Sequence, residues 1–558
     1  VESSAFKNCK ALKSITIYKT GKVENPKYAS HDGILYEAVE NNTGEFSLLL
    51  APYAKDGSVQ IFDGTTLVSD YALANSDIEK IVVPETVTKV GNNAFANMRK
   101  LTEVEFLGSD ASLEVTLGEQ VFSGNSKLTK VTLPAGLKAS TSHIVEYSND
   151  REEQDKNGDS YEVAHEFDME FDVMLFTKSF ALEEVNVNGD GGYYKSIDGM
   201  LCKADGTIVY CPRGREKDVV TTGVTAIGKN AFRNCNKIKS VTITGTVKNI
   251  GFDAFVCDTG HPSALTQLVF DSNRDDEELT IEGRAFYKAV VLTEVTLPEN
   301  LIKIEKYAFG YTKALKSVTI NAMGKYSNDK YVAEFDNDVF ASETDYVPDY
   351  YVENLTIGKD VPIFGITAVF GTSLSNITID PANKNFDLTD KKVILSADGT
   401  ELLYAFANAI SGTYTVKEGV KVIEANSFAN ATRMTSIVIP ASVETIGDGA
   451  FRNCGLNSVV FASGKDNAAT KLDIGAQAFY GCPIKGIFTL PERLTKVGDE
   501  AFKSVNATEI KFTGNKLTAI GNRAFENCDY LETITLSDGV TSIGDEAFWF
   551  CEKLQTIN

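Results

Sequence analysis

The sequence predicts an α/β solenoid that is rich in strands, and three observations support this prediction. Ala-Phe pairs recur at a fixed interval, with Phe502, Phe525 and Phe548 separated by 23 residues each time. Around each pair stand an Ile-Gly, two polar residues and then an apolar-x-x-apolar-x-apolar run. The chain of 558 residues repeats this pattern almost throughout. A fixed period of roughly 20 to 50 residues indicates stacked repeats whose core grows in one dimension.

Each part of the repeat has a predicted structure. Leu531, Ile534 and Leu536 form an alternating run, which favours a short strand with one buried face. Residues 540–543 predict a second short strand, and Gly544 allows a bend where a side chain would clash. We expect a helical turn around the Ala-Phe pair. One unit cannot bury these apolar groups alone, so stacking on its neighbours is required for stability.

The phenylalanines mark the copies of the repeat, and the 23-residue step occurs six times. Leu73 is interpreted as a degenerate copy, and longer steps are interpreted as insertions. The predicted repeat phenylalanines are Phe6, Phe95, Phe122, Phe180, Phe232, Phe255, Phe286, Phe309, Phe340, Phe370, Phe428, Phe451, Phe479, Phe502, Phe525 and Phe548.

A second module interrupts the repeats at three places. It reads YASHDGIL from Tyr28, YKSIDGML from Tyr194 and, more weakly, FDLTDKKV from Phe386. Two short apolar runs around a polar turn predict a hairpin. Other sequence motifs recur after each of these modules. We therefore interpret the single solenoid domain 1–558 as a tandem of blocks at about 28–193, 194–385 and 386–558. An acidic insertion occupies 139–177.

Composition limits the classes of partner. The formal net charge of −23 argues against nucleic acid and anionic membrane surfaces, which require basic patches. No apolar run is long enough to insert into a membrane. The chain begins at Val1 within a repeat and ends within a strand motif, so we expect a fragment or processed form whose signal peptide or anchor lies elsewhere.

The cysteines follow the repeat. Six of the nine stand three residues after a repeat phenylalanine, namely Cys9, Cys235, Cys454, Cys482, Cys528 and Cys551. A disulfide framework or zinc site would show paired or irregular spacing. A fixed repeat position instead predicts a small, buried and weakly polar filler.

The repeat resembles the BspA-like family of leucine-rich repeats. Residues 433–455, RMTSIVIPASVETIGDGAFRNCG, match the family pattern L-x-x-[IV]-T-[IL]-P-x-x-V-x-x-IG-x-x-AF-x-x-C almost position for position. The resemblance covers essentially the whole chain. It implies a right-handed leucine-rich-repeat superhelix with a parallel concave sheet, and a bacterial cell-surface or secreted protein used for adhesion or protein binding. The family offers no shared binding residue to transfer.

The strand residues that point outward form a threonine-rich, weakly charged strip. This strip is a candidate flat surface for a protein partner, although threonine also simply suits an exposed strand. Its candidate binding residues are Thr242, Thr296, Thr319, Thr356 and Thr378. A second candidate is the insertion TDYVPDYY, where Tyr346, Tyr350 and Tyr351 would stack on a sugar or anchor a protein, unless they pack on the solenoid itself.

Two acidic segments partly match a calcium loop. Asp155, Asn157, Asp159 and Glu166 occupy positions 1, 3, 5 and 12 of such a loop, but Ser160 replaces the glycine. The segment with Asp271, Asn273, Asp275 and Glu282 repeats the near-match without the glycine. Carboxylate-rich loops produce such matches by chance, so a solvated acidic loop is the default interpretation and no cofactor is expected.

The sequence carries no catalytic motif of the kinds H-E-x-x-H, G-x-S-x-G or a phosphate-binding loop. We therefore predict a non-enzymatic, adhesin-like protein that binds proteins or glycans on host or neighbouring bacterial cells. The alternatives are a structural spacer that projects another domain, and a carbohydrate-active enzyme with its site in an insertion.

Overall fold

The computed structural model describes most of the chain, which falls into two compact units. Unit 1 comprises Val1–Ser272 and Leu279–Leu292, and unit 2 comprises Asn273–Glu278 and Thr293–Asn558. Each unit is a strand-rich solenoid and is described by itself. The described residues are 6, 9–18, 27–39, 44–138, 152–154, 160–162, 175–258, 260 and 262–558, without 274, 323, 328–329, 333, 342–349, 365, 372 and 464–470.

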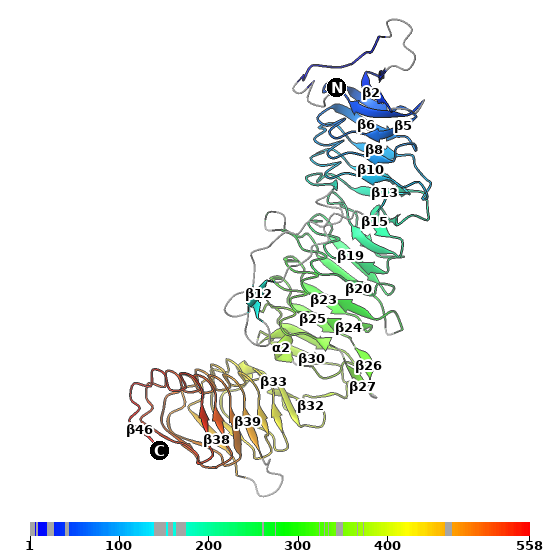
Figure 1. Ribbon diagram of the computed structural model, residues 1–558. Coiled ribbons are helices and arrows are strands. Elements are labelled where there is room, and N and C mark those ends of the chain that lie inside the picture. The colour runs from blue at the N-terminus through cyan, green and yellow to red at the C-terminus, as the bar shows by residue number, and fades with distance from the viewer. Residues whose placement is uncertain are drawn as a thin grey trace. The chain divides into compact units, whose positions relative to one another are not determined.

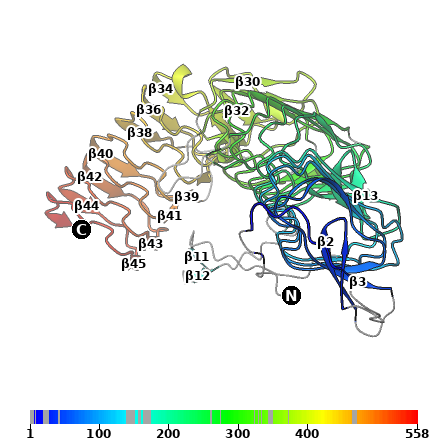
Figure 2. The same ribbon diagram turned by 90° about the horizontal axis from the view of Figure 1, so that it is seen from above.

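Each coil contributes one strand to each of two parallel sheets. The coils that repeat every 23 residues show this arrangement. The longer strand β42 (Ala507–Phe512) pairs in parallel with β44 (Thr533–Thr535), and the shorter β43 (Ala519–Ile520) pairs with β45 (Ser542–Ile543). Figure 2 shows the two rows of unit 2, with β34 to β44 on one side and β39 to β45 on the other. The predicted solenoid with parallel strands is confirmed.

Unit 1 contains sheets of longer strands and sheets of shorter strands (Figure 1). The first pair of sheets is β1 (Tyr28–His31), β2 (Ile34–Ala38), β3 (Phe46–Leu50), β5 (Thr65–Val68), β7 (Lys89–Val90) and β9 (Thr116–Leu117), together with β4 (Asp56–Gln60), β6 (Asp77–Val83), β8 (Glu103–Phe106), β10 (Lys130–Pro134) and β13 (Glu184–Asn188). The next pair is β14 (Tyr194–Ile197), β15 (Met200–Lys203), β16 (Thr207–Tyr210), β18 (Ala226–Ile227), β20 (Asn249–Ile250) and β22 (Leu279–Ile281), together with β17 (Val219–Val220), β19 (Ser240–Thr244) and β21 (Gln267–Asp271). The strands β11 (Glu152–Gln154) and β12 (Ser160–Glu162) form a separate antiparallel pair.

Unit 2 continues the same plan. Its longer strands are β23 (Glu294–Leu297), β25 (Ser317–Ile320), β29 (Asn354–Ile357) and β30 (Asn376–Ile379), then β34 (Gly412–Thr415), β36 (Met434–Ile439) and β38 (Ser458–Phe461), then β40 (Gly486–Leu490), β42, β44 and β46 (Thr556–Ile557). Its second row contains β24 (Leu301–Ile304), β28 (Glu334–Phe335), β31 (Phe386–Asp387), β32 (Val393–Ser396), β33 (Glu401–Ala405), β35 (Val422–Ile423), β37 (Thr445–Ile446), β39 (Leu472–Ile474), β41 (Leu494–Val497), β43 and β45. The strands β26 (Lys325–Ser327) and β27 (Lys330–Val332) form an antiparallel pair, and the described helical segments are α2 (Ile366–Phe370) and the 3-10 turn η2 (Ala407–Ala409).

The predicted hairpins are confirmed. β1 pairs with β2 and β14 pairs with β15 in antiparallel fashion, and β31 pairs with β32 in the same way. In the first two hairpins the turn is Asp-Gly with both residues at positive φ, 49° and 76° for Asp32 and Gly33, and 48° and 72° for Asp198 and Gly199. Two-residue turns of this kind match the twist of the strands that they join. Each hairpin begins a sheet, but the division into three blocks stays an interpretation.

The core of each unit contains runs of stacked aromatic rings from successive coils. In unit 2, the rings of Phe479, Phe502, Phe525 and Phe548 are stacked with centroids 5.4 Å apart at each step. The expected burial of like side chains over one another is therefore present.

One predicted repeat phenylalanine is wrong. Phe180 has 52% of its surface exposed, whereas Phe176 is 1% exposed and is stacked on Phe122, with ring centroids 5.3 Å apart. Tyr210 continues this stack at 5.1 Å from Phe176. The core ring of this coil belongs to the pair Leu175-Phe176, which lies within the predicted acidic insertion 139–177.

The helical turns expected around Ala-Phe are single tight turns. In most coils, the residues two before and two after the repeat phenylalanine have positive φ, as Arg523 (53°) and Asn527 (57°) do around Phe525. A left-handed residue on each side ends any helix after one turn. The adjacent glycines are required by close approach, since a Cβ at Gly498 would lie 2.5 Å from the backbone nitrogen of Ala476 in the preceding coil.

The cysteine position is buried in the coils of Cys235, Cys454, Cys482 and Cys528, as predicted, whereas Cys9 is exposed and Cys551 is half-buried. The thiols also have a polar role. Cys482 Sγ donates to the carbonyl of Phe451 in the preceding coil (3.0 Å), and Cys454 Sγ donates to that of Phe428 (2.9 Å). In unit 1 the hydroxyl of Ser179 takes this position and donates to Phe122 (2.7 Å). The filler is therefore also a hydrogen-bond donor between coils.

Candidate functional site

Four of the five predicted threonines lie in one row on the sheet β23–β25–β29–β30 of unit 2, which we call the Thr sheet. Thr296 is opposite Thr319, Thr319 is opposite Thr356, and Thr356 is opposite Thr378. Their apolar neighbours along each strand are buried, or partly buried on the edge strand β30, and this alternation turns the threonines outward. Thr296, Thr356 and Thr378 are exposed, and Thr319 is half-buried. We call this set the Thr row.

A second outward row runs beside the first, two residues earlier on each strand. This amide row consists of Glu294, Ser317, Asn354 and Asn376, which are in register across the four strands. Asn376 Nδ2 donates to Asn354 Oδ1 (2.9 Å), and Asn354 Nδ2 donates to Ser317 Oγ (3.3 Å). These hydrogen bonds fix the orientation of the amides. Apart from Glu294 at one edge, both rows carry uncharged hydrogen-bonding groups.

The corresponding face in unit 1 is different. On the sheet β4–β6–β8–β10–β13, which we call the charged sheet, Lys80 lies opposite Glu103 and Glu103 lies opposite Lys130. Lys80 Nζ is 3.1 Å from the carboxylate of Glu103 and 3.3 Å from that of Glu105. This face carries an ion-paired cluster around Lys80, so the same strand positions have two distinct chemistries in the two units.

The fifth predicted threonine is separate from the Thr row. Thr242 lies on β19 of unit 1, where it is half-buried between the exposed Val220 and Val269 of the neighbouring strands. The side chain therefore belongs to a mixed apolar strip.

The tyrosine candidates are only partly described. Tyr346 lies outside the described residues. Tyr350 donates its hydroxyl to Asp338 Oδ1 (2.5 Å), and its ring covers Gly371, where a Cβ would lie 2.3 Å from the ring. Burial and the Asp338 carboxylate raise the pKa of Tyr350 above its ordinary value. Tyr350 thus packs on its own solenoid, and Tyr351 is half-buried beside it.

The first calcium candidate, with Asp155, Asn157, Asp159 and Glu166, lies outside the described residues. In the second, the carboxylate of Glu282 accepts hydrogen bonds from Asn249 Nδ2 (2.8 Å) and from the backbone N–H of Phe252 (2.7 Å), so it is already engaged. Within the described part of the chain, no group of three or more His, Cys, Asp or Glu side chains is placed to hold a metal ion.

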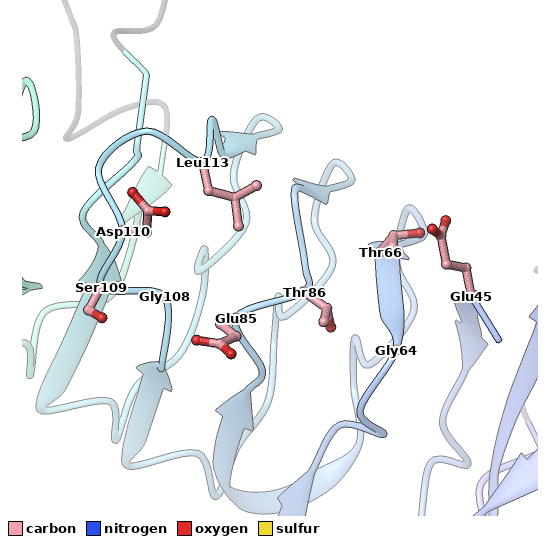
Figure 3. A pocket seen from close by; sticks show the side chains of 9 residues that line it. All are labelled: Glu45, Gly64, Thr66, Glu85, Thr86, Gly108, Ser109, Asp110 and Leu113. Carbon is pink, nitrogen blue, oxygen red and sulfur yellow. The ribbon is translucent and has the colours of Figure 1, made fainter.

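A groove of about 470 Å³ in unit 1 was not predicted from the sequence. It forms because the connection 107–115 between β8 and β9 is longer than the connections 84–88 and 61–64 of the two preceding coils. Figure 3 shows the lining side chains in three groups along successive coils. The lining residues are Glu45, Gly64, Thr66, Glu85, Thr86, Gly108, Ser109, Asp110 and Leu113.

The groove is acidic. Glu45, Glu85 and Asp110 line it, and none of its lining residues is basic. Hydrogen bonds from the hydroxyl (2.7 Å) and backbone N–H (2.8 Å) of Ser112 hold the pKa of Asp110 below its ordinary value. The carboxylates that line the groove therefore favour a positively charged group. The sequence signal for the groove is the unequal loop length, but the groove exists only where three coils stand side by side.

Comparison with solved structures finds similar chains, which include leucine-rich-repeat proteins. The pneumococcal vaccine antigen PcpA is 20% identical, with a TM-score of 0.42, over 65% of this chain and 84% of that one. A leucine-rich cell surface protein from Faecalibacterium prausnitzii A2-165 is 16% identical (TM-score 0.26; 96% and 95% covered), and a leucine-rich-repeat protein from Bacteroides ovatus ATCC 8483 is 15% identical (0.30; 96% and 94%). A search of curated proteins gives no significant match.

Among the described residues, no helix is both long and apolar enough to cross a membrane.

The family model of the BspA-type leucine-rich-repeat region matches residues 57–152, 216–331, 265–389, 402–472 and 472–558. These segments cover well over half of the chain and include the motifs that form the coils. The chain therefore belongs to the BspA-type leucine-rich-repeat family.

Proposed function

We propose that the protein is an adhesin-like binding protein, displayed on the cell surface or secreted, which holds a protein or glycan of a host or neighbouring bacterial cell. The observation that carries this proposal is the pair of rows on the Thr sheet, which are uncharged apart from Glu294 at one edge. Four in-register strands present hydroxyl and amide groups from a rigid, hydrogen-bonded scaffold. Repeat proteins commonly bind partners along such extended surfaces.

The energetics of desolvation favour this face over the charged sheet. A partner that covers Lys80, Glu103 and Glu105 would have to strip water from ion pairs, which seldom gains affinity. Covering hydroxyls and amides costs less, and each can form a new hydrogen bond with the partner. The hydrogen-bonded amide row is also pre-oriented, which reduces the entropy lost on binding.

The proposal is tested with the whole chain on arrays of extracellular-matrix proteins, bacterial surface proteins and glycans. We expect binding that is weakened in T296K/T356K, because two exposed lysines interrupt the Thr row. The matched control is T132K, which introduces lysine at the same repeat position of the charged sheet, opposite Glu105. Ligands that bind wild type and T132K but not T296K/T356K support the proposal. Equal binding by all three proteins, or no ligand at all, would contradict it and favour a spacer.

A further inference from the structure

The spacing and chemistry of the two rows narrow the class of ligand, and this inference rests on the proposed function. We propose that the Thr sheet binds a neutral, linear, β-linked polysaccharide that lies across the strands, with successive sugars over successive strands. The rows run perpendicular to the strands, and neighbouring strands of a sheet are ~4.8 Å apart. This interval is close to the rise of one sugar in an extended β-linked chain.

The width of the face fits a single chain of sugars. The Thr row and the amide row are two residues apart on each strand, a separation of ~6.6 Å. A flat ribbon of sugars placed between them would meet threonine hydroxyls on one side and amides on the other. The side chains in both rows are short, apart from Glu294 on the edge strand, so the ribbon can lie flush.

The hydrogen-bonding groups are complementary to sugar hydroxyls. Asn376 uses one amide hydrogen within the row, which leaves its second hydrogen as a donor, whereas Asn354 Nδ2 donates to both Ser317 Oγ and the carbonyl of Lys316 and is held in place by these bonds. Threonine hydroxyls both donate and accept, and their methyl groups offer apolar contact to the sugar ring. Each sugar would therefore meet a threonine on one side, and the two sugars over β29 and β30 would both meet an asparagine on the other.

Charge complementarity selects a neutral polymer. The chain has a formal net charge of −23, so an anionic polysaccharide is repelled as it approaches. The Thr sheet itself has no charge in its two rows beyond Glu294, so a cationic partner gains little there. A neutral chain meets neither penalty.

The test is affinity electrophoresis of the whole chain in gels that contain a soluble neutral β-glucan, with an anionic polygalacturonate gel for comparison. We expect retardation by the β-glucan only, and roughly tenfold weaker binding by T296K/T356K. T132K should be retarded like wild type, and equal thermal unfolding of the three proteins shows that the variants are folded.

The result that overturns the inference is an absence of retardation in any neutral β-glucan, or retardation that T296K/T356K does not reduce. This failure is distinguishable from failure of the proposed function. If T296K/T356K loses binding to a protein on the arrays while the β-glucan retards nothing, the face is a protein-binding surface and the polysaccharide is wrong. If no ligand depends on the Thr row, both proposals fail.

Discussion

Cys482 shows how a single residue links two coils. Its thiol donates to the carbonyl of Phe451 at 3.0 Å, and burial beside Cys454 raises the pKa of Cys482, so the thiol keeps its proton. We expect C482A to destabilise the protein by roughly 1–2 kcal/mol, from a lost hydrogen bond and a small cavity. C482S should cost less, because serine keeps a donor, as Ser179 does in its coil. Urea-induced unfolding of the two variants measures the difference.

The opposite order of stability would mean that the position requires only apolar volume. At the scale of single residues, the sequence predicted the burial of Cys482 from its fixed place in the repeat. It did not predict the hydrogen bond, because the acceptor belongs to the preceding coil and the donor is cysteine in some coils and serine in another. The fixed place of a residue in the repeat identifies a buried position. Its hydrogen-bond acceptor becomes known only when the structure shows which coil lies beside it.

The hairpin β14–β15 is held by its turn residue. Asp198 accepts from Arg215 and from Lys217 Nζ (2.6 Å), and Arg215 Nη1 also donates to the Asp198 carbonyl (2.6 Å). Burial raises the pKa of Asp198, but the hydrogen bond from Lys217 and the charge of Arg215 outweigh it, so the pKa is lowered. We expect D198N to destabilise the protein at neutral pH by roughly 1–2 kcal/mol, since the carboxylate is partly exposed and screened.

The loss should depend on pH in a defined direction. A lowered pKa in the folded state stabilises the protein above the unfolded value of 3.8, and this contribution is lost as the pH falls through the folded value. The gap between wild type and D198N in thermal unfolding should therefore be full above about pH 5 and shrink below about pH 4. D190N, on an exposed loop, is the control. A gap that does not change with pH would show that the turn geometry, and not the ion pair, is responsible.

Secondary-structure elements were predictable where the cause is local. Asp-Gly between two apolar runs specified the turns at Asp32 and Asp198, and alternation specified which threonines point outward. Phe176 was missed because the predicted insertion 139–177 included it. The single turns around the repeat phenylalanines were predicted as helical turns, because positive φ at a residue such as Arg523 cannot be inferred from its residue type. Prediction of the groove would have required a comparison of the lengths of three neighbouring connections, 61–64, 84–88 and 107–115.

At the scale of the whole molecule, the energy of each solenoid is carried by contacts between neighbouring coils. The steps Phe502 to Phe525 and Phe525 to Phe548 have the same ring spacing, 5.4 Å, and nearly parallel rings. One coil can therefore replace the next. We expect deletion of 503–525 to leave a folded protein, because Phe502 and Phe548 become neighbours in the stack and every strand keeps its register.

Deletion of 515–525 is the matched comparison, since it removes β43 and one ring but keeps β42. Because this deletion is not a whole repeat, every following side chain is shifted out of register, and the coils after it cannot stack on those before it. Circular dichroism and limited proteolysis should show a β-rich, resistant protein for the first deletion and a loosened C-terminal part for the second. If deletion of the whole coil were as disruptive as the partial one, stability would depend on contacts beyond the nearest neighbour. The Thr sheet could not then be treated as a surface that its own four coils are sufficient to build.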